Sequence, residues 1–161
     1  MGNITTRPIE QKDNAAIARI IRDTLTEFGA AKPGTVYYDE STDDLAGMFE
    51  EPFSQYLVME QDGEVVGGSG IFPTEGLPNG CCELVKLYLK PEMRGKGHGK
   101  ALIEACVDAA NNFGYEMMYL ETMHELDTAL KLYEDCGFRR IDAPLGNTGH
   151  HGCDIWMEKD L

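Results

Sequence analysis

The chain has 161 residues with 42% hydrophobic content, which suits one globular domain over residues 1–161. Its 28 acidic and 14 basic side chains give a formal net charge of -14, which argues against nonspecific nucleic-acid binding because phosphate neutralisation needs Lys and Arg. No apolar run approaches the roughly 20 residues of a membrane span, and the opening segment lacks the apolar stretch of a secretory signal. The five cysteines form no CxxC pair, so we expect a cytoplasmic protein with reduced thiols.

Apolar periodicity and turn residues predict strands mixed with helices along the whole chain. In chain order we expect a strand at 3–9, helices at 14–28 and 42–50, strands at 54–61, 64–72 and 81–90, a helix at 97–113, a strand at 115–122, a helix at 127–136, and strands at 138–143 and 153–161. Asp13 and Asp127 are the expected helix caps, and Asp62-Gly63 is the expected turn of a hairpin. Short turns and helical connections both occur, so the pattern favours a mixed sheet with helices on its faces.

A glycine-rich turn, "PEMRGKGHGK" at residues 91–100, joins a predicted strand to a predicted helix. The first amides of a helix have no internal partner, and glycines let backbone approach a ligand, so this turn predicts an anion site. Basic residues cluster around it, against the single acid Glu92: Lys86, Lys90, Arg94, Lys96 and Lys100. A phosphate-binding P-loop would need Ser or Thr where Ala101 stands, and the glycine spacing does not fit a dinucleotide fingerprint.

The order Arg94-Gly95-x-Gly97-x-Gly99 resembles the signature of the GNAT superfamily of acetyl-CoA-dependent N-acetyltransferases. The segment "ELVKLYLKPEMRGKGHGKALIEA" is similar to the central motif of that family, and "ALKLYEDCGF" at 129–138 is similar to its second motif. The resemblance implies an α/β (α+β) domain with a mixed, mostly antiparallel sheet of about seven strands flanked by about four helices. It also implies acetyl-CoA as cosubstrate.

The resemblance places coenzyme A on two neighbouring segments. Amides of the turn would bind the pyrophosphate, at Arg94, Gly95, Lys96, Gly97, His98, Gly99 and Lys100. The pantetheine arm would pair with the backbone of the preceding strand at Leu87, Tyr88 and Leu89, as a peptide pairs with an open strand edge. One departure lies at Leu126, where many members carry an asparagine that contacts the cofactor; Asp127 or Thr128 are the polar residues beside it.

Two residues match catalytic positions of the family. Tyr133 matches the tyrosine that protonates the leaving thiolate, with a core aromatic role as the alternative. Glu83 matches a strand position where some members place a general base, with a solvated acid as the alternative. By strand alternation Glu83 would share an apolar face with Val85, Leu87 and Leu89, where desolvation raises the pKa of an acid.

The acceptor amine cannot be read from the sequence, although two loops are candidates to bind it. Tyr37, Tyr38 and Asp39 offer an aromatic and acidic subsite, and His150 and His151 precede the last strand; an ordinary surface loop is the alternative for each. The histidines and Cys153 lack the spacing of a zinc site, so no metal is expected. We expect a small-molecule amine acceptor and leave a homodimer open. The alternatives are transfer of another acyl group or a non-catalytic coenzyme-A-binding regulator.

Overall fold

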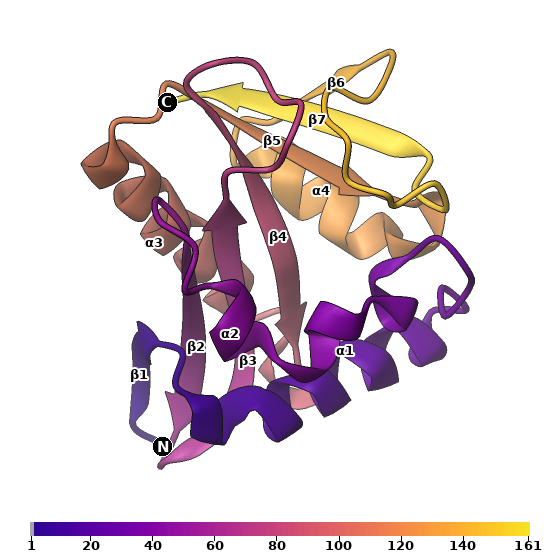
Figure 1. Ribbon diagram of the computed structural model, residues 1–161. Coiled ribbons are helices and arrows are strands. Elements are labelled where there is room, and N and C mark those ends of the chain that lie inside the picture. The colour runs from indigo at the N-terminus through magenta and orange to yellow at the C-terminus, as the bar shows by residue number, and fades with distance from the viewer. Residues whose placement is uncertain (1) are drawn as a thin grey trace.

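The computed structural model describes residues 2–161, which form one sheet covered by helices (Figure 1). The strands are β1 (Ile4–Pro8), β2 (Gln55–Gln61), β3 (Glu64–Phe72), β4 (Cys81–Leu89), β5 (Met117–Thr122), β6 (Arg139–Ile141) and β7 (Ile155–Asp160). The α-helices are α1 (Asn14–Glu27), α2 (Leu45–Met48), α3 (His98–Phe113) and α4 (Asp127–Asp135). The predicted seven strands, four helices and chain order are confirmed.

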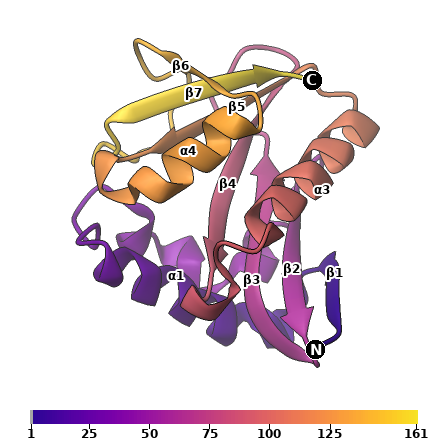
Figure 2. The same ribbon diagram turned by 180° about the vertical axis from the view of Figure 1, so that it is seen from behind.

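The strands lie in the order β1-β2-β3-β4-β5-β7-β6. All neighbours are antiparallel except β4 and β5, so the mixed, mostly antiparallel character is also confirmed. The parallel pairing of β4 with β5 covers only residues 81–83 of β4, after which the two strands diverge (Figure 2). The edge of β4 that faces β5 is therefore open beyond Glu83.

Helices cover both faces of the sheet, with α1 and α2 on one face and α3 and α4 on the other (Figures 1 and 2). The apolar stripe of α1 is buried against the sheet through Ile17, Ile21 and Leu25. Leu130 of α4 and Ile103 of α3 enter the core on the opposite face. None of the helices between residues 2 and 161 has the length and apolar character that a membrane crossing would need.

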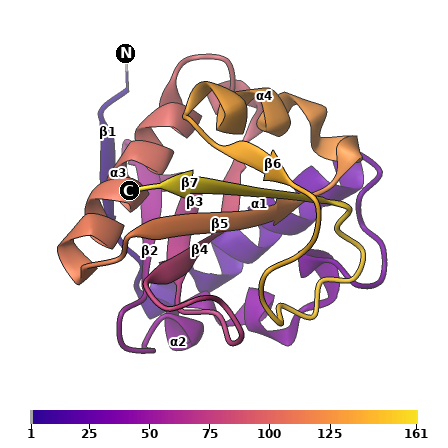
Figure 3. The same ribbon diagram turned by 90° about the horizontal axis from the view of Figure 1, so that it is seen from above.

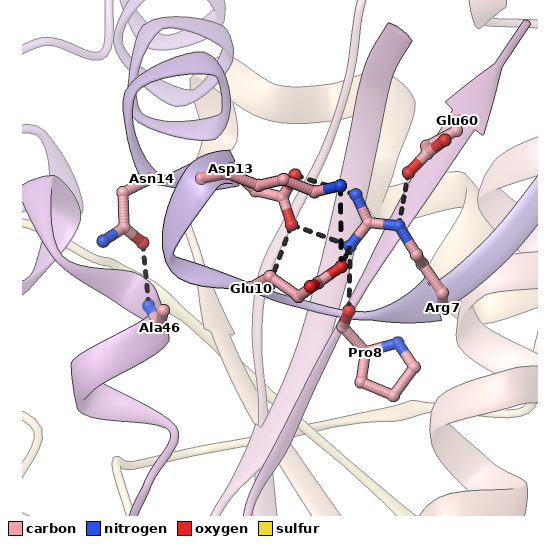
Figure 4. Close-up of polar contacts among 8 residues, drawn as sticks. Arg7, Pro8, Glu10, Asp13, Asn14, Ala46 and Glu60 are labelled. Atoms are coloured by element: carbon pink, nitrogen blue, oxygen red, sulfur yellow. Dashed lines mark hydrogen bonds and ion pairs between the residues drawn. The ribbon is translucent and has the colours of Figure 1, made fainter. Parts of the chain in front are cut away.

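The expectation that Asp13 caps α1 is wrong. Asp13 already has helical backbone angles, whereas a capping residue has extended ones, and its carboxylate is taken by other donors. It accepts hydrogen bonds from two guanidinium nitrogens of Arg7 and from the N–H of Glu10, each at 2.8 Å (Figure 4). The bond from Arg7 holds the pKa of Asp13 below its usual value. Asp127 is likewise no cap, because it lies inside the first turn of α4.

A bulge in β4 overturns the expected alternation of its side chains. Lys86 has a φ of 55°, a left-handed conformation that is rare for a residue with a side chain, and the pairing with β3 shifts register there. As a result Leu84 and Leu87, three residues apart, pack against the same cluster on the α3 side. Glu83 therefore does not share a face with Leu87 and Leu89, as regular alternation would require.

Candidate active site

A cleft of about 560 Å³ opens where β4 and β5 diverge. Its walls come from β4, the end of β5, the start of α3 and α4, together with parts of α1 and the loop before β7. The expected site residues that line it are Glu83, Leu87, Tyr88, Leu89, Arg94, Gly95, Gly97, Gly99, Lys100, Tyr133 and His150. Residues expected to bind the acyl donor and residues expected to catalyse transfer thus share one cleft.

The glycine-rich turn closes one end of this cleft with unpaired backbone amides. Gly95 and Gly97 have φ values of 75° and 87°, which only glycine adopts without strain. The first amide to bond within α3 is that of Ala101, to the carbonyl of Gly97, so the amides of the three preceding residues have no partner inside the helix. An added Cβ at Gly99 would lie 2.8 Å from the end of the Leu132 side chain of α4, so that side chain would have to shift.

The basic residues around the turn are mostly paired within the protein. Three have acidic partners: Lys86 with Asp39, Lys90 with Glu64, and Arg94 with Glu27. Arg94 also donates from Nε to the carbonyl of Leu89 and lies over the Phe28 ring, so its side chain fastens the turn to α1. Within residues 2–161, Lys96 and Lys100 have no acidic partner. The free positive potential at this end therefore comes from these two lysines and the α3 amides.

Glu83 lies at the point where β4 and β5 diverge, and its side chain is 5% exposed. Its carboxylate accepts a hydrogen bond of 2.6 Å from the Thr74 hydroxyl. Burial raises the pKa of Glu83 to about 7, while the Thr74 bond opposes that rise. At neutral pH this carboxyl group can exchange a proton with a ligand in the cleft, which an ordinary solvated glutamate cannot do efficiently.

Tyr133 projects from α4 into the same cleft. Its ring packs edge-on against Phe138, with centroids 6.0 Å apart. Burial raises the pKa of its phenol, so the group stays protonated at neutral pH. Within the described part of the chain the Tyr133 hydroxyl makes no hydrogen bond, which leaves its proton available to a ligand.

A carboxylate that the sequence analysis did not single out, Glu121, lies at the same end as Glu83. Its side chain is 3% exposed, and its oxygens accept hydrogen bonds from Tyr119 at 2.6 Å and from Thr148 at 2.5 Å. Glu83, Glu121 and His150 each offer an atom within 4.8 Å of the other two. An acid inside the otherwise apolar strand "MMYLET" was the available signal for Glu121.

His150 connects this cluster to the loop between α1 and α2. Its Nε2 lies 2.6 Å from the Asp39 carboxylate, and Asp39 also pairs with buried Lys86 at 3.7 Å. A second tie joins the same loops, from the N–H of Gly152 to the carbonyl of Gly34 at 2.8 Å. Figure 3 shows the two loops side by side at one end of the sheet. From these loops Val36, His150 and Cys153 line the cleft at the end opposite the glycine-rich turn.

Other candidate residues lie outside the walls of the cleft. Tyr37 packs against the core beneath Arg22, while Tyr38 is 61% exposed and His151 is exposed on its loop. Lys96 and His98 belong to the turn but do not line the cleft. At the position of the missing asparagine, Leu126 contributes an apolar wall, and Thr128 lies beside it in the cleft.

The arrangement suits a long ligand that carries an anionic group at one end and a reactive group at the other. Amides and lysines could meet the anionic end, the open edge of β4 could pair with an extended amide-bearing arm, and Glu83 and Tyr133 are groups that can accept and donate a proton.

Comparison with known proteins gives a consistent assignment. The sequence pattern of the Acetyltransferase (GNAT) family matches residues 16–138. The uncharacterized N-acetyltransferase YjgM of Escherichia coli K12 is 42% identical over 156 residues, covering 96% of this chain and 93% of that protein. A GNAT-family acetyltransferase structure from Staphylococcus aureus Mu50 has a TM-score of 0.87 at 17% identity, covering 99% of both chains.

A further solved structure is the PaiA N-acetyltransferase of Thermoplasma acidophilum in complex with coenzyme A. It has a TM-score of 0.77 at 19% identity and covers 99% of both chains, which indicates a shared fold. The family match spans most of the chain, and the Escherichia coli relative is similar over nearly its full length. The chain is therefore an acyltransferase that belongs to the GNAT family of acetyltransferases.

Proposed function

We propose that this enzyme transfers the acetyl group of acetyl-CoA directly to the primary amine of a small molecule. The observation that carries the proposal is that one cleft joins the free amides of the glycine-rich turn to Glu83 and Tyr133. The anionic end of coenzyme A would bind at the amides, and its pantetheine arm would lie along the open edge of β4 at Leu87, Tyr88 and Leu89.

Each chemical step has a residue suited to it. Glu83 removes a proton from the acceptor ammonium, and the neutral nitrogen then attacks the acetyl carbonyl. When the tetrahedral intermediate collapses, the carbon–sulfur bond breaks and Tyr133 donates its proton to the leaving thiolate, while the proton that the attacking nitrogen loses restores the phenol. The pKa of Glu83, about 7, matches the first role, and the raised pKa of the Tyr133 phenol matches the second.

Direct transfer is favoured over an acetyl-cysteine intermediate. Among residues 2–161, Cys153 is the cysteine that lines the cleft. Burial raises the pKa of its thiol to about 12, so the nucleophilic thiolate is scarce at neutral pH. The amine must then attack the thioester itself.

A small acceptor is favoured because the two loops joined by Asp39 and His150 restrict the far end of the cleft. A peptide would need an open groove there, whereas a compact amine can enter alongside Glu83. The cytoplasm, where acetyl-CoA is abundant, remains our expectation for the location of the enzyme.

The test is a thiol-release assay with acetyl-CoA and a panel of small amines, with the products identified by mass spectrometry. We expect coenzyme A and acetylated amine in equal amounts, strongly reduced by Tyr133→Phe and unaffected by the matched surface change Glu116→Gln. Binding of acetyl-CoA without turnover on any amine would instead favour a non-catalytic coenzyme-A-binding regulator. Turnover with another acyl-CoA alone would correct the donor.

A further inference from the structure

The acceptor end of the cleft carries an uneven set of charges. Two carboxylates line it, at Glu83 and Glu121, and a third, Asp39, contacts the Lys86 and His150 side chains of the wall without itself lining the cleft. The side chains of Lys86, Glu121 and His150 are 2%, 3% and 13% exposed, and residue Glu83 is 5% exposed. The Asp39 side chain is 29% exposed. Buried charges need partners, so an excess of carboxylates favours a cationic occupant.

Both basic side chains at this end are already committed to the same carboxylate. Lys86 Nζ lies 3.7 Å from one Asp39 oxygen, and His150 Nε2 lies 2.6 Å from that same oxygen. Neither is therefore available to bind a carboxylate on the acceptor without giving up Asp39. The other cations of the cleft wall, Arg94, Lys100 and Lys131, belong to α4 or to the turn at the opposite end.

Glu121 is held as a fixed hydrogen-bond acceptor. The Tyr119 hydroxyl donates to one of its oxygens, and the Thr148 hydroxyl donates to the other. Burial and the adjacent carboxylate raise the pKa of Tyr119, so this phenol remains a donor. Glu83, in contrast, accepts a single hydroxyl bond, from Thr74. The two acids are thus held differently. The arrangement suits Glu121 to bind a positive charge and Glu83 to transfer a proton.

We propose that Glu121, with Glu83, binds the ammonium group of the acceptor, and that the site selects amines with no carboxylate next to the reacting nitrogen. This proposal rests on the proposed function and adds the class of substrate to it. An α-amino acid would bring its carboxylate beside Glu83 and Glu121, where no uncommitted cation can neutralise it.

The test compares acceptors that differ only in the carboxylate: tyramine with tyrosine, agmatine with arginine, and tyrosine with its methyl ester. We expect kcat/KM to be at least about 100-fold higher for tyramine than for tyrosine and for agmatine than for arginine, because an unpaired buried carboxylate is costly. The methyl ester should recover most of that difference. Equal or better use of the free amino acids would overturn the proposal.

The variant Glu121→Gln keeps the shape of the side chain and removes its charge. We expect the KM for the amine to rise about tenfold or more, since a charged hydrogen bond is lost, while the KM for acetyl-CoA stays within about twofold. Glu116→Gln, just before the same strand, is the matched control and should change neither constant. An unchanged amine KM in Glu121→Gln would overturn the role of Glu121.

Two further measurements separate this proposal from the proposed function. If no amine is acetylated, calorimetric titration of the coenzyme-A-loaded protein decides: amines that bind the wild type but not Glu121→Gln support the ammonium site, although the enzymatic proposal fails. If no amine binds, the ammonium site fails too. Loss of activity on chelation, restored by Zn²⁺, would show that the Glu83, Glu121 and His150 cluster holds a metal instead, which also overturns it.

Discussion

Replacing Glu83 by glutamine should produce a defect whose size depends on pH. Glutamine keeps the size of the side chain and can still accept the Thr74 hydrogen bond, but it cannot take a proton. A general base typically contributes about 100-fold or more to the rate. With a pKa of about 7, Glu83 is roughly nine-tenths ionised at pH 8 and roughly one-tenth ionised at pH 6.

The ratio of wild-type to Glu83→Gln activity should therefore be about 100 at pH 8 and fall to about 10 at pH 6. The assay is thiol release at saturating acetyl-CoA, with kcat/KM for one amine measured from pH 5.5 to 9. Using the ratio cancels the ionisation of the amine, which is the same for both proteins. A ratio that does not change with pH would refute the assignment of Glu83 as the base.

Thr74→Val provides an independent check on the same residue. The Thr74 hydroxyl lowers the pKa of Glu83, so removing it should raise that pKa further and move the acidic limb of the profile to higher pH. A profile that stays in place would mean that another group controls the limb.

Three more changes test separate parts of the structure. Tyr133→Phe should lower kcat about 100-fold and leave the KM for acetyl-CoA nearly unchanged, because it removes only the proton donor. Steady-state kinetics measure both constants, and an unchanged kcat would mean that Tyr133 has only a structural role. Gly97→Ala should lower the free energy of unfolding by about 1 kcal/mol, because φ is 87° at this position, although the added Cβ meets open space. The same change should weaken coenzyme A binding about fivefold. Thermal unfolding measures the first effect and calorimetry the second, and an unchanged affinity would contradict a role for the turn. Asp13→Asn should destabilise the fold by about 2 kcal/mol, because it weakens the charged hydrogen bonds from Arg7, which keeps its pairs with Glu10 and Glu60. Asp23→Asn on the exposed side of α1 should have no such effect, and equal thermal unfolding of the two variants would show that the pair contributes little.

Local signals in the sequence predicted most of the elements because each is set by neighbouring residues. The apolar stripe of α1 and the glycine that ends α3 act within a few positions, and the structure has both helices close to their predicted bounds. The glycine-rich turn is local too, since positive φ at Gly95 and Gly97 depends on the absence of a side chain.

Features that depend on long-range contacts were not predictable from such patterns. The bulge at Lys86 changes which β4 side chains share a face, and a lysine with positive φ gives no warning in the sequence. Asp13 looked like a helix cap because the sequence does not show that its carboxylate binds Arg7 of β1 in place of the helix amides. The Asp39–His150 contact joins residues 111 positions apart, so no periodicity could reveal it.

The most direct test of acetyl transfer in this cleft is a single-turnover experiment. The protein is loaded with one equivalent of acetyl-CoA, held without acceptor, and then mixed with an amine and quenched at short times. Direct transfer predicts no acetyl group on the protein, thiol release only after the amine is added, and one acetylated amine for each coenzyme A. Thiol release before the amine is added, with the acetyl group on Cys153, would contradict direct transfer.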